Sequence, residues 1–173
     1  MSIIILFRGK AGTGKSTLSD ELGKRLHIPV LHKDDIYDSV AGYVSEHDLR
    51  NQICFEFLYR FLETIIHSKA AIILDFGLNH FHDAQKLKGW IENRGGELKV
   101  FHCICSDESI WSERLTDRSI NPLPNQLITN LAELKKHYKD ATTELLEGEI
   151  ILDTVQDKEI LVNQAESLIL GHS

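Results

Sequence analysis

Short, wholly apolar runs alternate along the chain with longer segments in which apolar residues recur every three or four positions. The runs are typical of strands buried on both faces of a sheet, and the longer segments are typical of amphipathic helices. Strands are predicted at residues 3–7, 29–32, 70–74, 99–105 and 149–152. Because strands and helices alternate, we expect an α/β fold whose sheet is mainly parallel.

The strongest helical pattern lies between the second and third predicted strands. From Ile53 to Ile65 large apolar residues are spaced three or four apart, which predicts a helix over about residues 46–67. Ser45 and Asp48 are predicted to cap its start. Further helices are predicted at residues 17–26, 83–93, 107–118, 126–146 and 157–170. The sequence has no repeat and no linker, so we expect a single domain spanning residues 1–173.

Composition adds that the chain is an ordinary globular one. It has 173 residues, of which 42% are hydrophobic and 26% charged, and no apolar run is long enough to cross a membrane. The first apolar run stops at Arg8 and has no basic segment before it, unlike a signal peptide. Three cysteines suit a reducing cytoplasm, where we expect the protein to act as a monomer or homodimer.

The charge balance bears on possible partners. The net charge is −7, and no run of Lys or Arg is longer than two residues. Proteins that hold long nucleic acids usually carry a basic stripe, so nucleic acid is a disfavoured partner although a local basic groove stays possible. A small-molecule ligand is the favoured partner.

Residues 9–16 read Gly-Lys-Ala-Gly-Thr-Gly-Lys-Ser, and they fill every fixed position of the phosphate-binding loop G-x-x-x-x-G-K-[ST]. Glycines let the backbone take positive φ, so that amide hydrogens converge on a phosphate at the start of the next helix. Lys15 supplies a charge for the β- and γ-phosphates, and Ser16 supplies a hydroxyl ligand for Mg²⁺. The predicted nucleotide-binding residues are Gly9, Ala11, Gly12, Thr13, Gly14, Lys15, Ser16 and Thr17.

Several classes of phosphate-loop protein are excluded by missing motifs. The chain has neither the N-K-x-D motif nor the D-x-x-G switch of a GTPase. Asp75 ends a predicted strand, but Phe76 follows where an ATPase core normally has a glutamate that polarises water. Small-molecule kinases need neither feature. They need a carboxylate that activates the acceptor and cationic groups that close over the transferring phosphoryl.

Candidate carboxylates follow the second predicted strand, in the stretch His32-Lys33-Asp34-Asp35-Ile36-Tyr37-Asp38. Ligands of such sheets bind at the carboxyl ends of the strands. Asp34 could therefore accept a proton from the acceptor hydroxyl or hold the magnesium shell through water. Asp35 is a second candidate for the acceptor side. Acidic residues also cap helices and occupy turns, which is the alternative for Asp35 and the favoured interpretation for Asp38.

Candidate cationic groups lie on the helix predicted at residues 107–118. Arg114 and Arg118 are four residues apart, so they share one helix face and could bracket one anion. The alternative is an exposed helix whose partners are Glu113 and Asp117. Prolines interrupt the pattern at residues 119–125, which predicts an exposed loop. We favour a closing lid over about residues 107–126.

Together these motifs occur in the order seen in small phosphate-loop kinases. The chain most resembles the 5′-kinase domain of phage polynucleotide kinase and the small AAA-type kinases related to it. Chloramphenicol phosphotransferase, gluconate kinase and adenylate kinase are similar in layout. The resemblance implies a three-layer P-loop NTPase fold, with ATP and Mg²⁺ as donor and cofactor. We expect a five-stranded parallel sheet of order 2-3-1-4-5, with flanking helices and a lid.

The resemblance also implies roles for single residues. Asp34 would be the general base, and Lys15 and Ser16 would hold the ATP phosphates and Mg²⁺. Arg118 would be the lid arginine on the transferring phosphoryl, assisted by Arg114. Asp75 would organise the acceptor side. Adenine would lie against the loop that begins at residues 153–155.

One departure from the resemblance narrows the acceptor. The polynucleotide kinase has an arginine three residues after its first aspartate, near the acceptor phosphate, whereas this chain has Tyr37. We therefore expect transfer of the γ-phosphoryl of ATP to a hydroxyl of a small molecule, with Tyr37 on the acceptor side. The alternatives are a polynucleotide or nucleoside 5′-hydroxyl kinase, and an ATP-binding regulatory protein without catalysis.

Other candidate ligands are given structural roles. Cys103 and Cys105 lie on one face of a predicted strand without a second pair, so we expect buried core residues and no zinc site. His80 and His82 follow the third predicted strand, and a structural or surface role is favoured for both.

Overall fold

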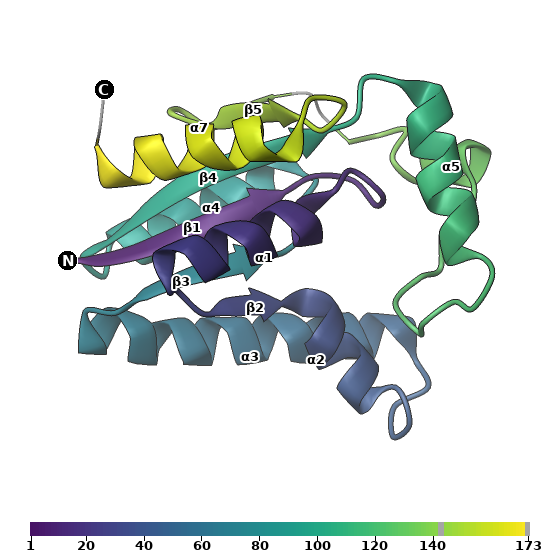
Figure 1. Cartoon of the computed structure of the whole chain (residues 1–173). Helices are drawn as coiled ribbons and strands as arrows, with labels where there is room; N and C mark the ends of the chain where they lie inside the picture. Colours follow the sequence, from purple (N-terminus) through teal and green to yellow (C-terminus); the bar gives the residue numbers. More distant parts are fainter. Residues whose placement is uncertain (142–143, 172–173) are drawn as a thin grey trace.

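The computed structural model describes residues 1–141 and 144–171, and its centre is a five-stranded parallel sheet (Figure 1). The strands lie in the order β2-β3-β1-β4-β5, which confirms the predicted order 2-3-1-4-5. Their bounds are β1 Ser2–Arg8, β2 Val30–His32, β3 Ala71–Asp75, β4 Gly96–Ile104 and β5 Ile150–Asp153. The central strand β1 is thus flanked by partners that come much later in the chain.

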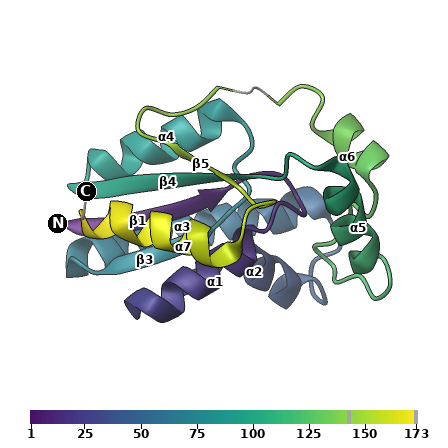
Figure 2. The same ribbon diagram turned by 45° about the horizontal axis from the view of Figure 1, so that its top comes forward.

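Helices cover both faces of the sheet, which makes three layers (Figures 1 and 2). Side chains alternate along a strand, so Ile4 and Leu6 of β1 point to one face and Ile5 and Phe7 to the other. The first pair packs against α3 (His47–Ser68) and α4 (Phe81–Glu92). The second pair packs against α1 (Lys15–Leu26) and α7 (Lys158–Leu170). Burial on both faces explains why residues 3–7 of β1 are all apolar.

The remaining helices gather beyond the carboxyl ends of the strands, where the site is expected. They are α2 (Lys33–Val40), α5 (Glu108–Arg118) and α6 (Leu131–His137). Figure 2 shows α5 and α6 together at this end of the sheet. Within the described residues, no helix combines the length and the apolar character that a membrane crossing requires.

One predicted helix is wrong, and one observed helix was not predicted. The helix predicted at residues 126–146 is wrong, because only Leu131–His137 is helical and residues 142–143 lie outside the described part. Asn130 caps its start by accepting a hydrogen bond from the Glu133 amide. Only Leu134 is buried in this helix, and Leu127, seven residues earlier on the same predicted face, is 58% exposed. Conversely, the helix α2 over residues 33–40 was not predicted; its first turn carries two carboxylates that favour a helix start.

Smaller boundaries also differ. The predicted cap of α3 by Ser45 and Asp48 is wrong, because the N-cap is Glu46 and no side chain caps the helix. Instead, Arg50 organises the preceding loop by donating to the carbonyl oxygens of Val44 at 2.5 Å and Ala41 at 3.3 Å. Arg50 contacts residues that precede it by six and nine positions. A capping motif covers only the first few residues of a helix, so it does not predict such contacts.

Candidate active site

The phosphate-binding loop joins β1 to α1 in the expected strand–loop–helix order. Gly9 takes φ 140°, and a Cβ there would lie 2.3 Å from the carbonyl oxygen of Cys103, so only glycine fits. Gly14, at φ 88°, is the N-cap of α1 and places the first amide hydrogens of the helix toward the loop. Lys15 Nζ donates to the carbonyl oxygen of Lys10 at 3.0 Å, so the lysine folds across the loop. The loop therefore concentrates positive charge and amide donors in one place.

A chain of hydrogen bonds runs from this loop into the sheet. Ser16 Oγ donates to Asp75 Oδ2 at 2.6 Å, and His32 Nδ1 lies 2.8 Å from the same oxygen. On the other side of the ring, His32 Nε2 lies 2.9 Å from Asp20 Oδ1. Asp75 is 6% exposed and ends β3. The structure thus brings the oxygens of Ser16 and Asp75 together at the start of α1.

Within this chain of hydrogen bonds, the surroundings favour the charged forms of Asp75 and His32. Burial alone would raise the pKa of Asp75, but the hydrogen bond from His32, the Lys15 charge and the Ser16 hydroxyl outweigh it and hold the pKa below its usual value. The hydrogen bond to Asp75 and the charges of Asp75 and Asp20 raise the pKa of His32 from 6.5 to about 9, although burial opposes them. His32 is therefore an imidazolium at neutral pH.

This shift predicts a pH dependence of stability. The unfolded chain releases the His32 proton near pH 6.5 and the folded chain only near pH 9, so the stabilisation is complete below pH 6.5 and is lost as the pH rises toward 9. The loss is at most about 3.5 kcal/mol, for a shift from 6.5 to about 9 at about 1.4 kcal/mol per pH unit. Urea unfolding midpoints measured from pH 6 to 9.5 should fall across this window, and His32→Gln should flatten the fall. An equal slope in both proteins would contradict the assignment.

Asp34 lies in the first turn of α2, just beyond β2. Its side chain opens to solvent, yet the surrounding protein displaces part of its water, and this burial together with the Asp75 charge raises the pKa of Asp34. Lys15 is close enough to oppose this shift. The structure therefore brings Asp34 near the phosphate loop, with a carboxylate that holds its proton more readily than usual.

The neighbouring candidates on α2 lie differently. Tyr37 is 3% exposed, and its hydroxyl lies 2.8 Å from His47 Nδ1, so it braces α2 against α3. Asp35 is exposed, and the described residues show no side-chain hydrogen bond to it. Asp38 accepts two hydrogen bonds from Asn125, at 2.9 Å from the amide nitrogen and 2.6 Å from Nδ2. The Lys15 and Asp75 charges act on the pKa of Asp34, which links this carboxylate to the loop.

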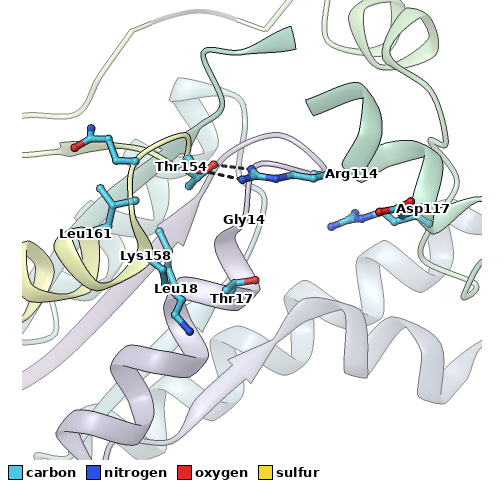
Figure 3. A pocket seen from close by; sticks show the side chains of 11 residues that line it. Gly14, Thr17, Leu18, Arg114, Asp117, Thr154, Lys158 and Leu161 are labelled. Carbon is cyan, nitrogen blue, oxygen red and sulfur yellow. Dashed lines mark hydrogen bonds between the residues drawn. The ribbon is translucent and has the colours of Figure 1, made fainter. Parts of the chain in front are cut away.

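The two arginines of α5 have different environments. Arg114 donates from Nη1 to Thr154 Oγ1 at 2.8 Å and from Nη2 to the Thr154 carbonyl at 2.9 Å (Figure 3). Its partner is thus the loop after β5. The alternative interpretation paired the arginines with Glu113 and Asp117, and within the described residues Arg114 hydrogen-bonds to neither of them. Arg118 lines the adjoining pocket without such a contact among the described residues. Both arginines line the same pocket, but of the two only Arg114 makes a side-chain hydrogen bond among the described residues.

A pocket of about 330 Å³ lies between α5, the phosphate loop and the loop after β5 (Figure 3). The lining residues are Gly12, Gly14, Thr17, Leu18, Arg114, Asp117, Arg118, Thr154, Gln156, Lys158 and Leu161. Its wall mixes apolar side chains with a few polar groups, as is typical of small-molecule sites. It adjoins the loop on the side where the loop that begins at Asp153 lies.

The segment after α5 reaches across to α2 (Figure 1). The paired hydrogen bonds from Asn125 to Asp38 fasten its end to the helix that carries Asp34. At the other end, Trp111 Nε1 donates to the carbonyl oxygen of Ala11 at 2.8 Å, so α5 is joined to the phosphate loop. The predicted lid region thus connects the loop with α2. Trp111 and Asn125 carried no recognisable signal in the sequence.

The Asn125 contact predicts a measurable change in lid opening. Asn125→Ala removes the side-chain donor to a carboxylate, a bond worth about 1.5–3 kcal/mol in favourable cases. We expect amide hydrogen exchange in residues 119–127 to accelerate by about tenfold or more. Asn121→Ala is the matched control, since no side-chain hydrogen bond of Asn121 occurs in the described residues. Similar exchange in the two variants would show that the contact does not hold the lid.

Other sequence candidates behave as structural residues. Cys103 and Cys105 are buried as predicted, and burial raises the pKa of Cys103 to about 12. Among the described residues, no three His, Cys, Asp or Glu side chains cluster as metal ligands. His80 and His82 are exposed at the start of α4. Besides Trp111 and Asn125, sequence reasoning gave no role to His32, which contacts Asp75.

A parallel sheet of order 2-3-1-4-5 with a phosphate-binding loop after its central strand defines a P-loop nucleotide-binding protein. The chain belongs to the AAA domain family, whose profile matches residues 4–138. No curated protein matches the sequence.

Solved structures share the fold at low sequence identity. A candidate kinase from Chloroflexus aurantiacus J-10-fl is 20% identical, with a TM-score of 0.76 over 99% of this chain and 98% of that one. A sugar kinase from Janibacter sp. HTCC2649 is 16% identical, with a TM-score of 0.66 over 95% and 92%. A gluconokinase from Sinorhizobium meliloti 1021 is 16% identical, with a TM-score of 0.60 over 99% and 97%. At such identities the likeness shows the fold.

Proposed function

We propose that this chain is an ATP- and Mg²⁺-dependent kinase that transfers the γ-phosphoryl group to a hydroxyl of a small molecule. The observation that carries the proposal is the position of Asp34. It lies at the carboxyl end of β2, with its charge coupled to Lys15 and Asp75, while the pocket of about 330 Å³ lies on the other side of the loop. A donor held by the loop would then have its nucleoside in the pocket and its terminal phosphate toward Asp34.

The donor side is supported by the loop and its neighbours. The loop amides and the start of α1 would bind the phosphates, with Lys15 as the mobile cation. The nucleoside would lie between α5 and the loop carrying Thr154, which Arg114 ties together. Arg118 lines the same pocket and would stabilise charge on the transferring phosphoryl when the lid closes. We also propose that adenine lies against the loop that begins at residues 153–155.

Ser16 and Asp75 fit a magnesium ion. Their oxygens lie 2.6 Å apart at the helix start, and hard oxygen donors are what Mg²⁺ prefers. When bound, the ion neutralises charge on the β- and γ-phosphate oxygens. The Ser16 contact supports a metal-side role for Asp75, in place of the acceptor-side role that the resemblance implied. We propose Ser16 and Asp75 as the residues that hold the ion.

The acceptor side rests on Asp34. As a general base it would accept the proton of the acceptor hydroxyl while the oxygen attacks the γ-phosphorus. Its raised pKa brings it nearer to the range in which a carboxylate both stays ionised and takes a proton well. Asp34 is proposed over Asp35 because the Lys15 and Asp75 charges act on its pKa, and Tyr37 receives no catalytic role because its hydroxyl contacts His47.

An acceptor screen tests the proposal. Binding of ATP with Mg²⁺ is measured first, and ADP release is then followed with sugars, sugar acids, nucleosides, antibiotics and 5′-hydroxyl oligonucleotides. The sugar kinase and the gluconokinase of similar fold place sugars and sugar acids first in the panel. Turnover with a small molecule supports the proposal. Turnover with oligonucleotides alone, or ATP binding without any acceptor-dependent turnover, would favour one of the two alternatives.

A further inference from the structure

We infer that His32 is a positioning residue: its imidazole fixes the Asp75 carboxylate in the orientation that faces Ser16, and it thereby sets the affinity of the site for a nucleotide-bound divalent cation. The inference rests on the proposed function, since it takes Ser16 and Asp75 as the residues that hold the cation. His32 lies outside the predicted catalytic and nucleotide-binding residues.

The sheet register places the two side chains together. His32 and Asp75 are the last residues of β2 and β3, and they are paired in the parallel register. Neighbouring strands lie about 4.8 Å apart, so side chains on the same face of paired residues meet. The result is the 2.8 Å approach of His32 Nδ1 to Asp75 Oδ2. A histidine at this register position needs no loop to reach the carboxylate.

The contacts form a closed circuit through three elements. Ser16 and Asp20 are four residues apart on α1, so they lie on one face of that helix. Ser16 contacts Asp75 of β3 at 2.6 Å, and Asp20 contacts His32 of β2 at 2.9 Å. His32 and Asp75 close the circuit. The start of α1, which carries the phosphate-loop serine, is therefore fixed to the carboxylate by two independent routes.

Donor and acceptor chemistry determines what each atom does. Carboxylates only accept hydrogen bonds when ionised, so both ring nitrogens of His32 donate. Asp75 Oδ2 then accepts from both Ser16 and His32, whereas Oδ1 has no hydrogen bond within the described residues. A carboxylate fixed at one oxygen presents the other in a constant direction. Second-shell partners of this kind orient metal ligands, and their loss typically weakens metal binding by 10–100-fold.

Burial makes the role of His32 specific to Asp75. The Asp75 side chain is 6% exposed, while the Asp20 side chain is 50% exposed. A buried carboxylate without a partner is costly, but an exposed one is solvated by water. The Nδ1 contact is therefore expected to matter for the cation, and the Nε2 contact chiefly for packing against α1.

Two amide substitutions separate the contacts. In His32→Asn the amide nitrogen replaces Nδ1, so the bond to Asp75 is kept and the bond to Asp20 is lost. In His32→Gln the amide nitrogen replaces Nε2, so the bond to Asp20 is kept and the bond to Asp75 is lost. Both variants lose the imidazolium charge, which makes them matched in charge and close in size. Thermal unfolding of both measures any common loss of stability.

The experiment measures binding of Mn²⁺ in the presence of ADP, by electron paramagnetic resonance of free Mn²⁺, with no turnover required. We expect His32→Gln to weaken Mn²⁺ binding by about 10–100-fold, and His32→Asn by less than about 3-fold. Equal binding by the two variants and the wild type, or equal losses that follow their unfolding temperatures, would overturn the inference. Ser16→Ala removes a proposed ligand and is expected to lose the Mn²⁺ dependence of ADP binding. If the wild-type protein also bound ADP without any dependence on Mn²⁺, the proposed metal site itself would be overturned.

A spectroscopic measurement covers the case in which the variants do not fold. Histidine ring ¹⁵N and N–H resonances of the wild type should show two hydrogen-bonded N–H groups for His32. Titration with Mg²⁺ and ADP should shift the Nδ1–H resonance more than the Nε2–H resonance. Resonances of His32 that do not respond to the cation would overturn the inference.

Discussion

Replacing Asp34 by asparagine is expected to lower acceptor-dependent turnover by a factor of about 10²–10⁴, the usual contribution of a general base, while ATP binding persists. Asparagine keeps the size of the side chain but cannot take up the hydroxyl proton. The ATP phosphates are proposed to bind the loop amides and Lys15, which the substitution leaves in place. Removing a negative charge beside Lys15 could only strengthen ATP binding. Steady-state turnover and ATP titration measure the two effects separately.

The neighbouring carboxylate provides the control for this prediction. Asp35→Asn makes the same chemical change one residue along α2, on an exposed side chain. We expect its turnover to stay within about twofold of the wild type, as for a surface substitution away from the site. If Asp34→Asn retained full turnover while Asp35→Asn lost it, the base would be Asp35. If neither changed turnover, proton transfer to Asp34 or Asp35 would be ruled out.

Local patterns predicted those parts of the fold that depend on local chemistry. The β1 run is apolar because the strand is buried on both faces, and the loop glycines take the positive φ that glycine favours. The strand order followed from the resemblance and is confirmed. The helix predicted at residues 126–146 is wrong, because the leucines at helical spacing there do not share one buried face. Leu134 is buried, while Leu145 is 41% exposed.

The parts of the site that escaped prediction depend on contacts between distant segments. His32 reads as the end of a short strand, and only the register with β3 places it beside Asp75. Arg114 and Arg118 are four residues apart on one helix, which the sequence shows. The contact of Arg114 with Thr154 depends on the position of the loop after β5, which the sequence does not show. Tyr37 was assigned to the acceptor side from its distance in sequence to Asp34. The sequence could not show that α3 would supply His47 as its partner.

Arg8 carries the second large expected effect, this time on stability. Its side chain is 1% exposed and that of Glu149 is fully buried, and Arg8 Nε contacts Glu149 Oε1 at 2.6 Å. Arg8 Nη1 also donates to the Leu78 carbonyl at 3.0 Å. Arg8→Met would leave the Glu149 carboxylate buried without its cation, which typically costs about 3–5 kcal/mol. Urea unfolding should show a loss of this size, a large share of the stability of an ordinary domain.

A double substitution decides whether the charge or the packing is responsible. Burial would raise the pKa of Glu149, but contacts from His102, the Leu146 amide and the Arg8 charge lower it, so the carboxylate is ionised in the fold. His102 Nδ1 approaches Oε1 to 3.3 Å without hydrogen-bond geometry, whereas Arg8 Nε donates to the same oxygen at 2.6 Å. Adding Glu149→Leu to Arg8→Met removes the stranded charge, and well-packed apolar replacements of buried pairs are often close to neutral. We therefore expect the double variant to be more stable than Arg8→Met alone. If it were less stable, the loss would come from the Leu78 and Glu144 carbonyls that Arg8 also holds, and the cluster would matter as a backbone brace behind the phosphate loop.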